Sequence, residues 1–186
     1  MLLSEGQDTR NLARLRTTLG TMQLVLDPPE VSEALRHLEK ASEELAWSSA
    51  STKEVAVNNL EIARAHYLQG DFTVARDLCE HILASIEDAP ILAADAEVLW
   101  GQIAAADGDV DAAAAAYRRA VFRLTALGAD RDAAQLWFEL ADLFEGVGES
   151  AAALEAYRSA AAASGLRARP NSKTASSALA APQVRL

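Results

Sequence analysis

The residue types that most often carry catalytic or metal chemistry are few in this chain and are not clustered. The three histidines, His37, His66 and His81, fall in different stretches of helical pattern, and none pairs with another at metal-ligand spacing. His66 and His81 could approach each other across one helix pair near the single cysteine, Cys79, which leaves a zinc or thiol site as an alternative. We favour the simpler interpretation of a small buried thiol and two partly exposed imidazoles.

A second chemical pattern is the run Asp107-Gly108-Asp109-Val110-Asp111, which resembles the opening of a calcium loop. An EF-hand would need glycine at Ala112 and glutamate at Arg118, so the pattern fails at both positions. Helix capping at a turn explains these aspartates better. The chain also lacks a phosphate-binding glycine loop, a nucleophile elbow and an obvious triad. We therefore predict no catalytic residue, no metal site and no cofactor, and we do not expect an enzyme.

The net negative charge of the chain limits the classes of molecule that it is expected to bind. The 186 residues carry a formal net charge of -10, and all 27 acidic residues precede Arg167. Affinity for nucleic acid comes largely from Lys and Arg that neutralise phosphates, so we expect no direct nucleic-acid binding by this chain. No apolar run approaches the roughly 18 residues that a membrane span needs, and the first residues do not form a signal peptide. We expect a cytoplasmic protein with no membrane contact.

The apolar residues have the spacing of α-helices, so helices must position any functional surface of this chain. Leu12, Leu15, Leu19, Met22 and Leu26 follow intervals of three and four residues, which is typical of one apolar face of a helix. Breaks recur at Pro29, Gly70, Gly108 and Gly148, at separations of 41, 38 and 40 residues. This period predicts an all-α, right-handed solenoid of about four antiparallel helix pairs. The repeat domain is expected over 1–165, with pairs at about 8–47, 53–87, 91–127 and 130–165, and a disordered tail, basic and rich in Ala and Ser, over 166–186.

Local signals support these boundaries. Ser51 followed by Glu54 predicts a capping box at the start of the third helix. Gly70 and Asp71 predict the end of that helix and an N-cap for the fourth.

Aligned on the breaks, the pairs resemble the tetratricopeptide-repeat family over roughly residues 8–165. The last pair matches the family pattern best, and the third lacks the early aromatic because Glu97 stands there. The first pair is a divergent cap with proline in place of glycine. The matching residues are Trp137, Ala141, Gly148, Ala153, Tyr157 and Ala160 in the last pair; Gly101, Gly108, Ala113, Tyr117 and Ala120 in the third; Ala63, Gly70 and Ala75 in the second; and Ala34, Leu38 and Ala41 in the first.

Residues 58–83 and 128–166 also resemble the C-terminal sensory part of actinobacterial transcriptional regulators. In that family a helix-turn-helix head precedes tetratricopeptide repeats, and the repeats dimerise the regulator or sense a peptide, small molecule or partner. No such head is visible in this sequence, because the first helix pair has no recognition-helix character.

The tetratricopeptide resemblance also implies a concave groove lined by the first helix of each pair. Carried onto this sequence, the groove positions include Arg64, Tyr67, Val98, Gln102, Gln135, Phe138 and Asp142. Arg64 could pair with a partner's carboxylate, and Tyr67 and Phe138 could serve as flat apolar anchors.

Two functions remain open at this stage. The first is a non-enzymatic protein- or peptide-binding module, the sensory part of a transcriptional regulator, with a possible homodimer. The second is a ligand-free dimerisation or scaffold unit, which an apolar outer face at Leu12, Leu15 and Leu19 would favour because an exposed end cap should be polar.

Overall fold

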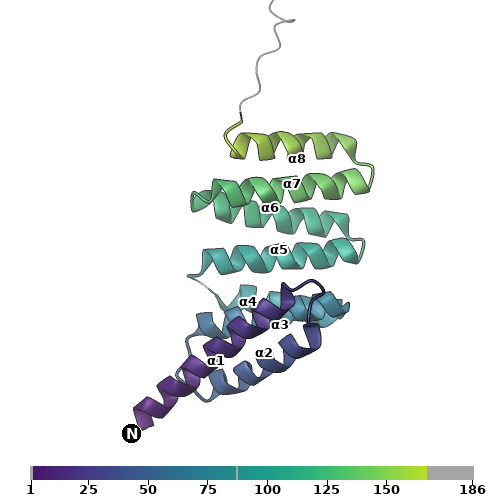
Figure 1. Cartoon of the computed structure of the whole chain (residues 1–186). Coiled ribbons are helices and arrows are strands. Elements are labelled where there is room, and N and C mark those ends of the chain that lie inside the picture. The colour runs from purple at the N-terminus through teal and green to yellow at the C-terminus, as the bar shows by residue number, and fades with distance from the viewer. Residues whose placement is uncertain (1, 87, 167–186) are drawn as a thin grey trace, which may run out of the picture.

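The chain folds into a stack of helices, as the computed structural model of residues 2–86 and 88–166 shows (Figure 1). The predicted tail lies outside these residues, except for Leu166. The described part contains eight α-helices and no strand, which confirms the all-α helical solenoid. The helices are α1 (Leu2–Leu24), α2 (Val31–Ala46), α3 (Thr52–Gln69), α4 (Phe72–Ser85), α5 (Pro90–Ala106), α6 (Val110–Ala126), α7 (Asp130–Gly146) and α8 (Ser150–Ala163).

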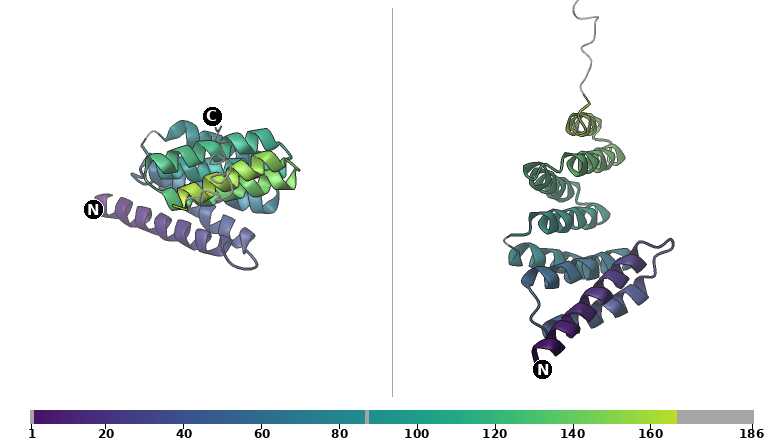
Figure 2. Two further views of the ribbon diagram at one scale, coloured as in Figure 1. Left: turned by 90° about the horizontal axis from the view of Figure 1, so that it is seen from above. Right: turned by 60° about the vertical axis from the view of Figure 1, so that its left-hand side comes forward.

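Each helix packs against the next one along the chain, and α1 and α5 also contact α3. Helices α5 to α8 lie one above another in a regular stack (Figure 1). Helices α1 and α2 run obliquely at the opposite end, and α1 projects beyond the outline of the stack when it is seen from above (Figure 2). The N-terminal pair is therefore the irregular part of the solenoid.

Small residues allow the helices to approach one another closely. Ala141 and Ala153 are 0% and 4% exposed, at the crossing of α7 and α8. Gly101 plays the same part between α5 and α6, where an added Cβ would lie 3.2 Å from the ring of Tyr117. Two large clusters of buried residues fill α3 to α5 and α5 to α8, while the clusters around α1 and α2 are small. The repeat signature thus marks the pairs with the larger apolar cores.

The helix ends follow the local signals with one exception. The capping box is present, since Ser51 Oγ accepts from the Glu54 amide at 3.3 Å and Glu54 accepts from the Ser51 amide at 2.9 Å. Asp109 caps α6 by accepting from the Ala112 amide at 3.0 Å. Asp71 is the N-cap residue of α4, as predicted, but its side chain makes no cap hydrogen bond. Its carboxylate lies 3.4 Å from His66 Nδ1 instead, at the end of the preceding helix.

The turns within the pairs explain the regular period. Gly70 closes α3 at φ 84°, and Gly148 follows α7 at φ 81°. Side chains disfavour this left-handed conformation, so glycine ends the first helix of these pairs and reverses the chain.

Helix α1 begins at Leu2, earlier than the predicted start near residue 8. Charged side chains attach α1 to its neighbours. Arg16 Nε lies 2.9 Å from a Glu44 carboxylate oxygen on α2, and two further arginines of α1 reach α3. No helix in the described part of the chain is long and apolar enough to cross a membrane.

Candidate partner-binding groove

The inner helices α3, α5 and α7 carry the seven residues predicted to line a groove. Arg64 on α3 is partly exposed and lies 3.1 Å from Glu61 one turn earlier. Its positive charge also acts on Asp95 of α5, where it opposes a raised pKa. Arg64 is therefore paired with a carboxylate of its own helix, and its charge reaches Asp95 of α5.

Tyr67 and Gln102 come together around a residue that the prediction did not include, Tyr117 of α6. The Gln102 side chain hydrogen-bonds with the Tyr117 hydroxyl, and Tyr67 lies close enough to influence the same group. Burial raises the pKa of Tyr117 to about 12, so its hydroxyl remains a neutral donor at physiological pH. The Tyr67 ring packs against Phe72 with centroids 5.8 Å apart. Tyr67 thus contributes to packing as well as to the surface.

The α7 residues form a second group around Tyr157 of α8. Phe138 is 50% exposed and packs edge-on against the Tyr157 ring, with centroids 5.1 Å apart. The Tyr157 hydroxyl donates to Asp142 at 2.6 Å and lies 2.8 Å from Glu145. Gln135 and Phe138 also line a shallow cavity of about 350 Å³ between α7 and α8. Three of the predicted residues therefore share one apolar surface with a polar edge.

Val98 belongs to neither of these two groups. It is half-buried and packs against the buried residues of α5 to α8. Its main contact is with the core.

The same arrangement occurs in the last two pairs, where a side chain of the inner helix hydrogen-bonds with a tyrosine of the outer helix: Gln102 with Tyr117, and Asp142 with Tyr157. Arg64 holds the equivalent position in the second pair. Each inner residue directly follows the small residue at the helix crossing, which is Ala63, Gly101 or Ala141. The repeat therefore presents a cation, an amide and an anion at equivalent places along the inner surface.

The remaining lining of the inner surface is acidic, which the sequence prediction missed. Asp95 is solvent-exposed, yet desolvation raises its pKa, with Arg64 opposing the shift and Asp132 adding to it. Burial likewise raises the pKa of Glu61. A carboxylate can be exposed and still lose part of its hydration when protein atoms flank it, as on a concave surface. Glu139 lies close enough to act on Tyr117 and adds a further negative charge.

Repeat position could have revealed Asp95. It precedes Gly101 by six residues, just as Gln135 precedes Ala141. The contribution of Tyr117 and Tyr157 was harder to see, because their rings match the family's packing aromatics and only the structure shows where the hydroxyl groups reach.

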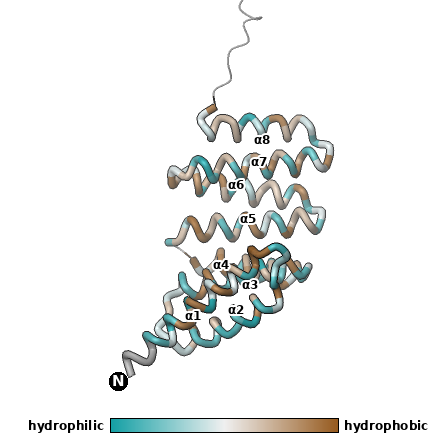
Figure 3. The backbone as a smooth tube through the Cα atoms, in the orientation of Figure 1, coloured by the Kyte–Doolittle hydropathy of each residue, from teal (hydrophilic) through white to brown (hydrophobic). Residues whose placement is uncertain are grey.

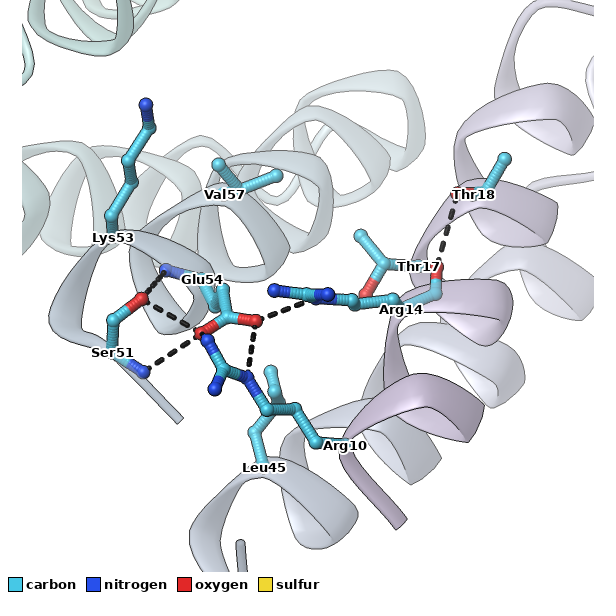
Figure 4. A pocket seen from close by; sticks show the side chains of 9 residues that line it. All are labelled: Arg10, Arg14, Thr17, Thr18, Leu45, Ser51, Lys53, Glu54 and Val57. Carbon is cyan, nitrogen blue, oxygen red and sulfur yellow. Dashed lines mark hydrogen bonds and ion pairs between the residues drawn. The ribbon is translucent and has the colours of Figure 1, made fainter. Parts of the chain in front are cut away.

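A basic region lies between α1 and α3 (Figure 4). A cavity of about 420 Å³ lies there, bordered by Arg10, Arg14, Lys53 and the capping-box residues of α3. Glu54 is at its centre: Arg10 donates to both carboxylate oxygens at 2.8 and 2.6 Å, and Arg14 donates at 2.6 Å. The Arg10 hydrogen bond is the main reason that the pKa of Glu54 lies well below its ordinary value. The cluster holds α1 against α3 and leaves positive charge in this region.

The arrangement offers recognition chemistry more readily than catalysis. Among the described residues, no group of three His, Cys, Asp or Glu side chains could hold a metal ion. His66 is engaged with Asp71, and His81 is exposed on α4. Burial raises the pKa of the Cys79 thiol to about 12, which keeps it protonated and unreactive. Hydrogen-bonding groups, charge and flat aromatic surface are what the residues predicted to line a groove could provide to a ligand.

Comparisons with known proteins support the fold. A scan against protein-family models and a search of curated proteins find no match. Among solved structures, the chain is similar to one titled "Crystal structure of MamA", with a TM-score of 0.58 and 16% sequence identity. The alignment covers 88% of this chain and 81% of that chain. At this identity the likeness shows the architecture alone, a helical solenoid of the tetratricopeptide type.

Proposed function

We propose that this chain is a non-enzymatic module that binds a protein or peptide segment along the inner surface of α3, α5 and α7. The observation that carries the proposal is the recurrence of Arg64, Gln102 and Asp142 at one repeat position, the last two hydrogen-bonded to a tyrosine of the outer helix. A regular row of different polar groups can read successive residues of an extended segment. Exposed Phe138 supplies an apolar anchor next to that row.

The charges around the proposed groove indicate which residue types the bound segment should contain. Asp95, Asp132 and Glu139 surround the middle of the surface, and Arg64 already pairs with Glu61. A ligand that places lysine or arginine at α5 and α7 would neutralise partly desolvated carboxylates, which strengthens the interaction relative to fully hydrated charges. The region between α1 and α3 is basic and suits an acidic residue or a terminal carboxylate. The preferred ligand is therefore a segment with a basic part and an acidic end.

The wider role rests on the resemblance of residues 58–83 and 128–166 to the sensory part of actinobacterial regulators. In that role, occupancy of the groove would shift the curvature of the solenoid or its self-association and so alter transcription. The second candidate, a ligand-free dimerisation or scaffold unit, is favoured by the exposed apolar face of α1.

Selection from a random peptide library tests the proposed groove. Wild-type protein should enrich peptides that contain Lys or Arg, and the double variant Asp95→Lys, Asp132→Lys should bind them at least about tenfold more weakly. Asp77→Lys with Glu155→Lys is the matched control. These exposed residues of α4 and α8 stand at one shared position, two residues after Ala75 and Ala153, and the net charge changes equally.

The control variant should bind the selected peptides like wild type. Equal loss of binding in both double variants would attribute the interaction to overall charge. Unchanged binding by the Asp95, Asp132 variant would remove the groove from the proposal.

A further inference from the structure

Helix α6, the outer helix of the third pair, carries a concentration of positive charge in an acidic chain. It lies between α5 and α7 in the stack (Figure 1). It contains Arg118, Arg119 and Arg123 and a single acidic residue, Asp111, whereas the whole chain has a net charge of -10. The three arginines and Phe122, which is 76% exposed, border a shallow cavity of about 400 Å³ beside α5. We call these three arginines and Phe122 the α6 basic patch.

A buried carboxylate of α5 holds two of these arginines. Glu97 is 2% exposed, and its two oxygens accept hydrogen bonds from Arg119 Nε at 3.2 Å and from Arg123 Nε at 3.1 Å. Arginines four residues apart share one face of a helix and repel each other, so the shared carboxylate keeps two like charges together. Arg118 takes no part in this ion pair and lies over the Phe144 ring, 5.8 Å from its centroid. One carboxylate against three arginines leaves a net positive charge at the patch.

Packing alone does not account for the charge of Glu97. Helix α5 is largely apolar, with Asp95 and Glu97 as its ionisable residues (Figure 3). Glu97 stands four residues before Gly101, just as Trp137 stands four residues before Ala141, and Trp137 packs against the apolar core. A buried ion pair is commonly no more stabilising than apolar packing, because desolvation of the charges offsets their attraction. A binding role for the arginines explains why the third pair has a carboxylate at this repeat position.

The two guanidinium groups that Glu97 holds retain donors for a second acceptor. Each donates to Glu97 through Nε, and the side chains of Arg119 and Arg123 are still 51% and 42% exposed. A guanidinium has five N–H donors and can bind a carboxylate through two parallel hydrogen bonds. Because Glu97 already restricts these side chains, a ligand loses less entropy in ordering them. Phe122 lies within one helical turn of all three arginines and adds an aromatic surface.

We propose that the α6 basic patch binds an acidic segment of a second protein, with its carboxylates on the arginines and an apolar side chain on Phe122. Charge complementarity selects this occupant. The arginines span only about 8 Å along the helix, which matches a few carboxylates. A long polyanion, such as nucleic acid, would extend over the acidic remainder of the chain and be repelled. The patch is on an outer helix, apart from the groove proposed on α3, α5 and α7, so it is a second binding surface of opposite charge.

Fluorescence anisotropy with a synthetic peptide tests the proposal. The probe is a fluorescein-labelled peptide in which glutamates flank a leucine, titrated with the full chain at low ionic strength. We expect a dissociation constant on the order of 10–100 µM that rises with added salt, since each exposed ion pair contributes little. The same peptide with glutamine in place of glutamate should not bind measurably. Absence of binding by the acidic probe, or equal binding of both probes, would overturn the proposal.

Variants of the patch locate the binding. Arg118→Glu should weaken binding of the acidic probe at least about fivefold, and Phe122→Ser at least about threefold. Both residues are exposed, so the melting temperature should change little. Arg158→Glu is the matched control for Arg118→Glu, because each arginine is exposed and directly follows a repeat tyrosine, and the net charge changes equally. The control should bind like wild type, and equal weakening by both charge reversals would assign the binding to overall charge.

Two further measurements separate the patch from the groove and from other anions. The groove variant Asp95→Lys, Asp132→Lys should bind the acidic probe at least as tightly as wild type, and Arg118→Glu should still bind the selected Lys- or Arg-containing peptides. Failure of one proposal is thus distinguishable from failure of the other. A labelled single-stranded DNA oligonucleotide should bind more weakly than the acidic peptide. Tighter binding of the oligonucleotide, lost in Arg118→Glu, would replace the protein segment by nucleic acid and overturn the proposal.

Discussion

The N-terminal pair, α1 and α2, and the three pairs from α3 to α8 reach the same hairpin shape by different means. The later pairs pack through buried alanines and aromatic rings at repeat positions, as at Ala141 and Tyr117. The first pair has small apolar clusters and relies on arginines that reach Glu44 and Glu54. It also leaves a row of apolar side chains of α1 and the following turn exposed: Leu12, Leu15, Leu19, Met22 and Leu26. The pair that departs from the repeat pattern is thus held by ion pairs more than by apolar packing, and it leaves apolar surface exposed.

The largest effect is expected from a charge in the core of the regular pairs. Ala141→Glu or Ala153→Glu would bury an unpaired carboxylate at the α7–α8 crossing, at a cost of several kcal/mol, comparable to a whole domain's stability of about 5–15 kcal/mol. Thermal unfolding followed by circular dichroism should show a lost or sharply lowered transition. Leu154→Glu changes a residue that is 50% exposed, beside Ala153, and is the control, with a small expected effect. A melting temperature within a degree or two of wild type for either alanine variant would contradict the packing of this crossing.

The next largest effects on stability are expected at two glycines that lie at helix crossings, Gly20 in the N-terminal pair and Gly101 in the third pair. In Gly20→Ala the new Cβ would lie 2.6 Å from Leu38 Cγ, a fully buried side chain, so the α1–α2 pair must separate. We expect a loss of about 1–3 kcal/mol. In Gly101→Ala the nearest atoms are 3.2 Å away in the Tyr117 ring, and the gain of about 1 kcal/mol in helix propensity offsets most of the crowding. Chemical denaturation of both variants checks this order, and a greater loss for Gly101→Ala would reverse it.

Lowering the pH should destabilise the attachment of α1 more than the packing of α3 and α5. The pKa of Glu54 is lowered, whereas the pKa values of Glu61 and Asp95 are raised. The pKa of Glu54 is lowered, chiefly by Arg10, so its contribution to stability is present above its ordinary 4.5 and is lost as the pH falls. Burial raises the pKa of Glu61 and of Asp95, so protonation of these groups favours the folded state. Hydrogen exchange between about pH 5 and pH 3, corrected for intrinsic rates, should show α1 losing protection before α3 and α5.

Glu54→Gln supplies the control for this experiment. Its α1 protection should be low already at neutral pH and should change little with acid, since the titrating group is gone. Acid-induced loss in α1 of the same size in wild type and Glu54→Gln would assign the effect to another group.

The smallest effect is expected at the C-terminus. Deletion of residues 170–186, which lie outside the described part of the chain, should leave the melting temperature unchanged, because the helical pattern ends before them. A large fall in melting temperature would show that this segment packs on the solenoid.

Much of the fold was predictable, because helix periodicity and glycine turns are local signals. Ser51 and Asp109 cap helices as expected, since a side chain needs to reach an amide only three residues away. Asp71 stands at the predicted N-cap position, but its carboxylate lies 3.4 Å from His66 Nδ1 and makes no cap hydrogen bond. Position within the repeat placed Gln102 and Asp142 on the inner helices, but the partners that define their surroundings come from other helices.

The charge around the predicted groove and the exposure of the apolar face of α1 were harder to predict from the sequence, because both depend on the neighbouring helices. Asp95 and Asp132 are unremarkable along the sequence, and their importance comes from their closeness across α5 and α7. An apolar stripe predicts burial but not the surface that buries it. Leu12 and Leu15 fit an ordinary amphipathic helix, and the structure shows that Ala13 and Leu24 face the core instead.

Hydrogen–deuterium exchange of the full chain, with and without a Lys- or Arg-containing peptide from the selection, tests the central claim most directly. We expect slower exchange in α3, α5 and α7 when the peptide is bound, with the outer helices α4, α6 and α8 unchanged. Protection confined to the outer helices, or to α1 and α2, would contradict the claim that the inner surface binds the partner.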